Sequence, residues 1–192
     1  MTFDKLADRC LLFVEERKQM IIELLKEAEL EISRKCHMFE DTRVYSCDGS
    51  TSYGLPGNYK QIIFLQYNGA KLFPAGEDEI SYNSSGDIDS GEPSGYFIRN
   101  NGIHVNYTST TGKLKLSYYG TVDGAQDPTS DPSPIIPNMY HRDLCNYAIA
   151  ISAAQDNPGL HDKHWVLWNE SIREIVNQDA DRELIHSVKR EV

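Results

Sequence analysis

Apolar residues at helical spacing dominate the N-terminal part of the chain. No Gly or Pro occurs between Phe3 and Met38, and apolar residues recur there every three or four positions with charged residues between them. The recurring positions are Phe3, Ala7, Cys10, Leu11, Val14, Ile21, Leu24, Leu25, Ala28 and Ile32. This spacing is typical of an amphipathic helix with one buried face. We therefore predict helix over residues 3–38, either continuous or broken near Arg17.

A strand pattern replaces the helical one near Val44. Between Tyr45 and Pro134 the apolar residues alternate or form short runs rich in Tyr, Ile, Phe and Val, and nearly all Gly residues fall here. These features predict strands near residues 62–67, 95–99, 102–107 and 113–119. Turns at 100–102 (Asn-Asn-Gly) and 108–112 would join the last three strands, because Asn and Gly tolerate positive φ angles. We expect a small antiparallel meander, with Leu114, Leu116 and Tyr118 on its covered face.

Helical spacing returns after Ile135. Apolar residues predict one helix from about Asn138 to residue 154, ended by Pro158-Gly159, and a second from about His161 to Gln178. Residues 179–192 are charged but retain Leu184, Ile185 and Val188, so in isolation they would form a marginal helix.

The predicted fold class is α+β: a helical bundle with an inserted antiparallel β-sheet region and a C-terminal extension. In this division residues 1–44 and 135–178 form the bundle, 45–134 form the inserted β region, and 179–192 form a docking tail.

Charge and cysteine content limit the classes of function and the cellular compartments that the sequence allows. The chain has 192 residues, 29 Asp and Glu against 19 Lys and Arg, and a net charge of -10, which excludes a nucleic-acid binder that works by bulk charge. Four cysteines without a CxxC pair favour a reducing compartment. The N-terminus lacks a signal-peptide pattern and no apolar run approaches membrane-spanning length, so we expect neither export nor a membrane anchor.

Candidate catalytic chemistry is sparse. His161 and His164 lie three residues apart at a predicted helix start, but a metal site needs further ligands that the sequence does not identify. The triplet 141–143 (His-Arg-Asp) lists catalytic residue types, yet neighbours on a helix point in different directions, and we interpret it as a solvated face. Cys145 lies in an apolar stretch, as a buried inert thiol would. We predict no enzyme activity, no cofactor and no metal.

Two surface features leave alternatives open. Acidic residues without a basic neighbour occupy the stretch between Lys71 and Arg99, namely Glu77, Asp78, Glu79, Asp87, Asp89 and Glu92. They form either solvated loops or a surface that repels a polyanion or meets a basic partner. The 11 Tyr residues, concentrated in the strand region, form either half-buried sheet positions or a sugar-binding face.

Four groups of residues occur in an order more distinctive than any of them alone. They are Leu55-Pro56-Gly57-Asn58-Tyr59-Lys60-Gln61-Ile62, then Gly91-Glu92-Pro93 with Gly95-Tyr96-Phe97-Ile98, then Leu114-Lys115-Leu116-Ser117-Tyr118-Tyr119, then Ile136-Pro137 ahead of Tyr140-His141-Arg142-Asp143-Leu144-Cys145-Asn146-Tyr147-Ala148. In this order they resemble the head-to-tail adaptor (neck ring or connector) proteins of short-tailed bacteriophages. The acidic insertion at 76–92 departs from the family pattern.

The resemblance implies a structural protein of the virion neck, assembled in the host cytoplasm. It implies a twelve-subunit ring between the portal protein and the tail tube or nozzle, with an acidic lumen through which DNA passes during genome ejection without specific binding. It also implies that the C-terminal tail docks on the portal through Arg182, Glu183, Leu184, Ile185, Val188, Lys189 and Arg190. The alternative hypothesis is a β-rich carbohydrate-binding module of a virion, in which the Tyr-rich sheet is the site.

Overall fold

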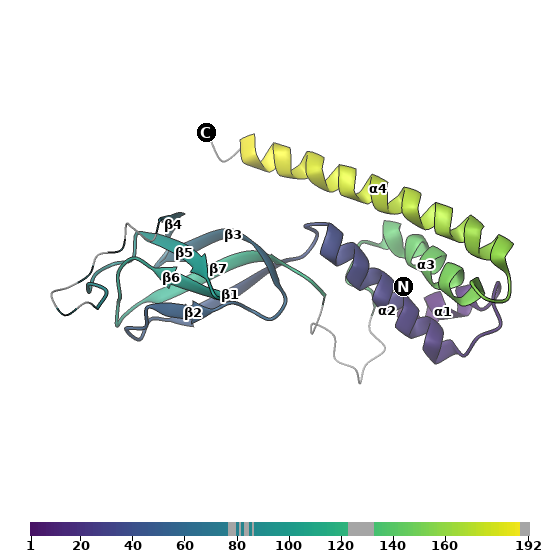
Figure 1. Cartoon of the computed structure of the whole chain (residues 1–192), viewed down its shortest axis with the longest axis horizontal. Coiled ribbons are helices and arrows are strands. Elements are labelled where there is room, and N and C mark those ends of the chain that lie inside the picture. Colours follow the sequence, from purple (N-terminus) through teal and green to yellow (C-terminus); the bar gives the residue numbers. More distant parts are fainter. Residues whose placement is uncertain (77–79, 81, 83–84, 86, 123–132, 189–192) are drawn as a thin grey trace. The chain divides into compact units, whose positions relative to one another are not determined.

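The computed structural model separates helices and strands into two units. It describes residues 1–76, 80, 82, 85, 87–122 and 133–188, with only the backbone described for 181–188. The helical unit comprises residues 1–38 and 121–192, and the β unit comprises residues 39–120 (Figure 1). Each unit has its own buried core.

Four α-helices and a short 3-10 helix make up the described part of the helical unit. They are α1 (Phe3–Cys10), α2 (Lys18–Lys35), η2 (Asn138–Tyr140), α3 (His141–Ala153) and α4 (Pro158–Val188). Their apolar stripes meet in a core whose most deeply buried members include Phe3, Leu6, Leu25, Ile32, Leu144, Trp168 and Ile175.

The N-terminal helix is broken, which confirms the second of the two alternatives. Residues 11–17 connect α1 to α2. Lys18 Nζ, at the start of α2, pairs with carboxylates of Asp4 and Asp8 in α1 at 2.8 and 2.6 Å. These contacts hold the start of α2 beside α1, so the two helices do not continue in line.

Helix α4 is longer than the sequence analysis predicted. It does not end near Gln178 but continues without interruption to Val188 (Figure 1). The stretch from Leu160 to Val188 contains neither Gly nor Pro, so no residue in it interrupts the helix.

Seven strands form one mixed sheet in the β unit. They are β1 (Glu40–Ser46), β2 (Ser52–Gly54), β3 (Tyr59–Tyr67), β4 (Ala70–Pro74), β5 (Gly95–Arg99), β6 (Gly102–Val105) and β7 (Lys113–Gly120). Their order is β1-β7-β3-β4-β5-β6-β2. All neighbours are antiparallel except β4 and β5, which pair in parallel through Phe73 with Gly95 and Pro74 with Tyr96.

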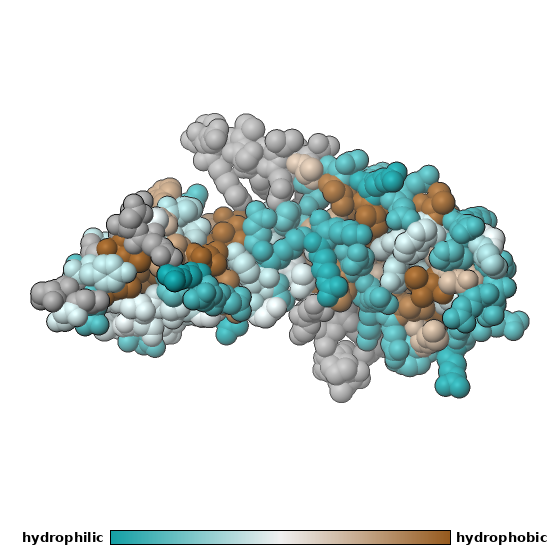
Figure 2. All heavy atoms as spheres, in the orientation of Figure 1, coloured by the Kyte–Doolittle hydropathy of each residue, from teal (hydrophilic) through white to brown (hydrophobic). Residues whose placement is uncertain are grey.

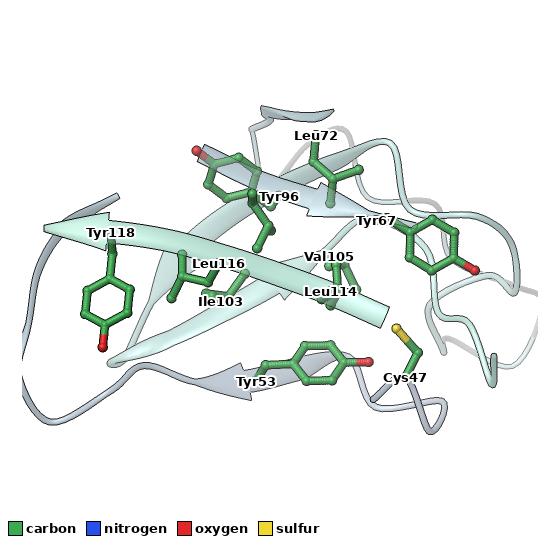
Figure 3. Close-up of a cluster of buried hydrophobic side chains, with 11 residues drawn as sticks. Cys47, Tyr53, Tyr67, Leu72, Tyr96, Ile103, Val105, Leu114, Leu116 and Tyr118 are labelled. Atoms are coloured by element: carbon green, nitrogen blue, oxygen red, sulfur yellow. The ribbon is translucent and has the colours of Figure 1, made fainter. Parts of the chain in front are cut away.

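The sheet curves into a nearly closed barrel around its own core. Figure 3 draws the buried side chains that fill it, which come from strands β2 to β7 and from Cys47 just after β1. Leu114, Leu116 and Tyr118 of β7 are among them, as the alternation predicted. The two edge strands meet through a side chain: Tyr45 of β1 donates its hydroxyl to the carbonyl of Gly54 in β2 at 2.7 Å, and its ring lies 5.5 Å from that of Tyr53.

The predicted bundle with an inserted antiparallel sheet is therefore wrong. The strands form a mixed, seven-stranded, barrel-like sheet with a separate core, and the parallel β4–β5 pair is what breaks the antiparallel pattern. The predicted turn at 100–102 is confirmed, since Asn100 and Asn101 have φ of 49° and 59° between β5 and β6. The predicted meander of three consecutive strands is wrong, because β6 pairs with β5 and β2 while β7 pairs with β1 and β3.

Candidate functional site: anchors and charged cavities of the helical unit

The polar residues of α3 hold neighbouring segments in place. His141 donates from Nε2 to the carbonyl of Ile136 at 3.1 Å, and Asn146 Oδ1 accepts from His164 Nδ1 at 3.0 Å. Asp143 Oδ1 accepts the hydroxyl of Ser171 in α4 at 2.7 Å.

Burial shifts the titration of these groups. It lowers the pKa values of His141 and His164, and it raises the pKa of Asp143. Both imidazoles are therefore neutral at pH 7, which suits their roles as hydrogen-bond donors to a carbonyl and an amide oxygen. The predicted solvated face holds for Arg142 alone, which is exposed. His141 is buried and Asp143 is half-buried, and both make the structural contacts given above.

A buried carboxylate on α2 anchors the approach to α3. Glu29 is fully buried, and its Oε1 accepts the backbone N–H groups of Ile135 and Ile136 at 2.5 and 3.0 Å. One turn along α2, the Ser33 hydroxyl accepts the backbone N–H of Val122 at 3.3 Å. Glu29 and Ser33 thus fix the chain on both sides of residues 123–132.

A cavity of about 360 Å³ with a basic rim opens between α1, α3 and α4. Phe13, Ile149 and Leu167 give it apolar walls, and Cys145, Asn146 and His164 also line it. Its three charged residues are all cations: Arg9, Arg142 and Lys163. Each is exposed, and none makes an ion pair within the described residues. We call this the basic cavity.

A second cavity has a volume of about 380 Å³. Its charged residues are all acidic: Glu15, Glu16 and Asp156. Phe13 lines both cavities, and the α3 positions that line them, from Arg142 through Ile149 to Ala153, share one helical face. We call this second space the acidic cavity.

Hydrophobic side chains remain exposed at Phe13, which lines both cavities, and elsewhere on the helical unit. Phe13 is 57% exposed and Leu12, beside it in the α1–α2 connection, is 80% exposed. On α4, Val166 is 55% exposed. Figure 2 shows the visible face of the helical unit as mainly hydrophilic, with hydrophobic side chains gathered in separate patches.

The last described anchor of α4 is Asp179. Its Oδ2 accepts the backbone N–H of His37 at 2.7 Å, just past the end of α2, and lies 3.3 Å from His37 Nδ1. The helix continues from Ala180 to Val188.

The predicted docking residues of the tail fall on this continuation and beyond it. Arg182, Glu183, Leu184, Ile185 and Val188 are positions of α4 whose side chains lie outside the description, and Lys189 and Arg190 lie outside the described residues.

The predicted acidic surface is described only in part. Glu77, Asp78 and Glu79 lie outside the described residues. Asp87 and Glu92 are exposed and Asp89 is half-buried, in the segment that leads to β5.

The two candidate metal ligands bind different partners. His161 donates from Nδ1 to the carbonyl of Ala150 at 2.9 Å, whereas His164 bonds to Asn146. In the described part of the chain, no three His, Cys, Asp or Glu side chains are grouped as metal ligands would be. Several of the Tyr residues are core positions of the barrel, namely Tyr53, Tyr67, Tyr96 and Tyr118.

Sequence reasoning missed the basic cavity because its cations come from three separate helices. Arg9, Arg142 and Lys163 form no motif along the chain, and only the fold brings them together. The one available signal was Arg142, which the sequence analysis assigned to a solvated face.

Comparison with known proteins identifies the family. The family model described as SU10 adaptor protein matches residues 1–190. The chain belongs to the SU10 adaptor protein family. This confirms the resemblance to phage head-to-tail adaptors that the order of motifs indicated. A search of curated proteins gives no match.

Family membership makes the chain a bacteriophage adaptor, a structural type of protein found in virions that contacts other virion components. The motif 136–148 has a structural role in the fold, because Ile136, His141, Asp143 and Asn146 all take part in the contacts that hold α3. Among the described residues, no helix has the length and apolarity needed to cross a bilayer.

Proposed function

We propose that this adaptor forms a ring between the portal protein and the tail, and that DNA passes through the ring during ejection. The observation that carries the proposal is the family match over residues 1–190, which includes both the helical unit and the β unit. The ring, the portal contact and the passage of DNA are inferences from that family.

The charge of the chain supports the passage of DNA. At a net charge of -10 per chain, twelve copies would carry about -120, so a ring of this protein repels the DNA backbone overall. A negatively charged lumen would let DNA pass through the ring without specific binding. Asp87, Asp89 and Glu92 are candidates for lumen positions, together with Glu77, Asp78 and Glu79.

The division into two units supports a bridging role. Each unit has a separate core, so one unit can hold a partner without the core of the other rearranging. We propose that the adaptor binds portal first and then offers the completed ring to the tail tube or nozzle.

An order-of-addition experiment tests this proposal. Portal protein and the tail component from the same phage are mixed with and without the adaptor, and complexes are separated by size-exclusion chromatography. We expect the tail component to co-elute with portal only when the adaptor is present. Co-elution of portal and tail without the adaptor, or failure of the adaptor to join either, contradicts the proposal.

A further inference from the structure

The basic cavity brings positive charge and apolar surface together. Arg9, Arg142 and Lys163 line it from three different helices, and all three are exposed. The chain has ten more acidic than basic residues, yet these three cations make no ion pair within the described residues. They favour a negatively charged occupant. The walls at Phe13 and Leu167 favour an occupant that also has an apolar part, because its burial removes apolar surface from water.

A buried amide in the same cavity has hydrogen-bonding capacity to spare. Asn146 lines the cavity and is only 6% exposed. Its Oδ1 accepts from His164 Nδ1 at 3.0 Å, whereas its Nδ2 group has no hydrogen-bond partner among the described residues. A buried N–H donor without a partner is costly, and an oxygen acceptor removes that cost. The amide therefore points to an occupant that carries oxygen acceptors, as a carboxylate does.

The charge of the rim reaches the interior of the cavity. His164 lines the cavity, and its ring lies 5.9 Å from that of Phe13. Burial is the largest cause of the lowered pKa of His164, and Lys163 and Arg142 lower that pKa further. An anion bound in the cavity would oppose these two cations and raise the pKa of His164.

Exposed apolar surface continues beyond the cavity. Phe13 is 57% exposed, and its chain neighbour Leu12 is 80% exposed. On α4, Val166 is 55% exposed and lies three residues from Lys163, so the two share one face of the helix. An occupant that also covers these side chains is larger than the cavity of about 360 Å³. A segment of a protein meets this requirement, whereas a small free acid would leave them exposed.

We propose that the basic cavity is a docking site for a segment of another virion protein in which carboxylates flank an apolar side chain. The apolar side chain enters between Phe13 and Leu167, and the carboxylates pair with Arg9, Arg142 and Lys163. Family membership supplies the setting, because an adaptor contacts other virion components. The inference deepens the proposed function by naming a surface of the adaptor, and it rests on that function for the partner, which is the portal or the tail component.

An acidic model peptide tests the chemistry of the cavity. The probe is a capped peptide in which three glutamates alternate with two leucines, and it is titrated into the full-length adaptor by isothermal titration calorimetry. We expect saturable binding with a Kd below about 1 mM that weakens as salt is raised. Matched peptides with lysine or glutamine in place of glutamate should bind at least about tenfold more weakly.

Charge reversal at the cavity locates the binding. Arg142→Glu combined with Lys163→Glu, the cavity variant, should weaken binding of the acidic peptide at least about tenfold and strengthen binding of the lysine peptide. Lys5→Glu combined with Arg173→Glu is the matched control, because it makes the same change of net charge at exposed positions outside the cavity. The control should bind the acidic peptide as the wild type does. Urea unfolding of all three proteins checks that each is folded.

The His164 imidazole reports whether the peptide enters the cavity. A pH titration of its ring resonances by NMR, with and without the acidic peptide, measures the pKa of His164. We expect the bound peptide to raise this pKa, because its carboxylates offset Lys163 and Arg142. An unchanged pKa at saturating peptide places the peptide elsewhere and overturns the inference.

Three other results overturn the inference. They are no saturation below about 1 mM, equal binding of the acidic and lysine peptides, and equal binding of the acidic peptide to the wild type and the cavity variant. Hexanoate offers a carboxylate and an apolar chain as a free small acid. If hexanoate binds more tightly than the acidic peptide, the cavity is a site for small molecules and the docking proposal is wrong.

Assembly with portal and the tail component separates this inference from the proposed function. In the order-of-addition experiment, the cavity variant should fail to bind one of the two components, while the control variant binds both. A cavity variant that still joins portal to the tail component overturns the inference and leaves the proposed function standing. A wild-type adaptor that joins neither contradicts the proposed function, whereas binding of the acidic peptide in the cavity would still support a docking site of this chemistry.

Discussion

Glu29 should be among the most sensitive single positions of the helical unit. It is fully buried, and its carboxylate accepts two backbone N–H groups that belong to the approach to α3. Glu29→Ala leaves both donors without this acceptor. A hydrogen bond to a charged group contributes about 1.5–3 kcal/mol, so two give a loss of about 3 kcal/mol or more. Glu29→Gln keeps an oxygen acceptor and should cost less.

Urea unfolding followed by tryptophan fluorescence measures this loss selectively. The chain has two Trp residues, Trp165 and Trp168, and both lie in α4, so the signal reports the helical unit and not the β unit. With a slope of about 1.5 kcal/mol/M, a loss of about 3 kcal/mol moves the midpoint down by about 2 M.

Glu23→Ala is the matched control for Glu29→Ala. Glu23 is an exposed carboxylate on the same helix, and its replacement should change the free energy of unfolding by less than about 0.5 kcal/mol. If Glu29→Ala unfolds at the same urea concentration as this control, the two backbone contacts do not anchor the segment and the reasoning fails.

Three further outcomes are expected. Tyr45→Phe removes the hydrogen bond to Gly54 that joins the edge strands β1 and β2, and it should lower the stability of the β unit by about 1 kcal/mol. Amide hydrogen exchange in β2 should become faster, and unchanged exchange would show that this hydrogen bond does not hold the two edge strands together. Burial and Asp41 raise the pKa of Tyr118 to about 12, so the stability that its protonated hydroxyl contributes is complete below pH 10 and is lost as the pH rises towards 12. Unfolding of the β unit followed by circular dichroism should show a smaller loss of stability over that pH range in Tyr118→Phe than in the wild type. Burial lowers the pKa of His141, so the stability that its neutral imidazole contributes is complete above pH 6.5 and is lost as the pH falls below that value. The urea midpoint of the helical unit should therefore decrease when the pH is lowered from 7.5 to 5.5, and it should decrease less in His141→Gln. An equal decrease in both proteins would count against a buried neutral imidazole.

Local patterns predicted the helices and one turn because the causes of those elements are local. The apolar stripe of α2 and the buried stripe of α4 repeat every three or four residues, and that period is visible in the sequence. The turn at Asn100 and Asn101 depends on two residues that accept positive φ, and the structure has them in that conformation. The extension of α4 past Gln178 was missed because charge was given more weight than the absence of a helix-ending residue.

The barrel could not be predicted from the same patterns. β1 is almost wholly exposed and shows no alternation, β2 has three residues, and β4 pairs in parallel with β5 across residues 75–94. These strands are defined by distant partners and not by their own sequences. The order of motifs in the chain nevertheless identified the family, because the motifs include both strands of the barrel and the residues that anchor α3.

The basic cavity shows the same limit for a surface feature. It is lined by Arg9 from α1, Arg142 from α3 and Lys163 from α4, and nothing in the spacing of these residues links them. The tail was the opposite case: its charged residues and its apolar Leu184, Ile185 and Val188 were visible in sequence, but its partner was assigned by resemblance alone.

The mass of the adaptor in solution, alone and mixed with portal from the same phage, tests the central claim most directly. Multi-angle light scattering after size-exclusion chromatography gives both masses. The account predicts that portal draws the adaptor into a complex of fixed stoichiometry, with one adaptor for each portal subunit. An adaptor that elutes separately from portal, with its mass unchanged, contradicts the proposed function.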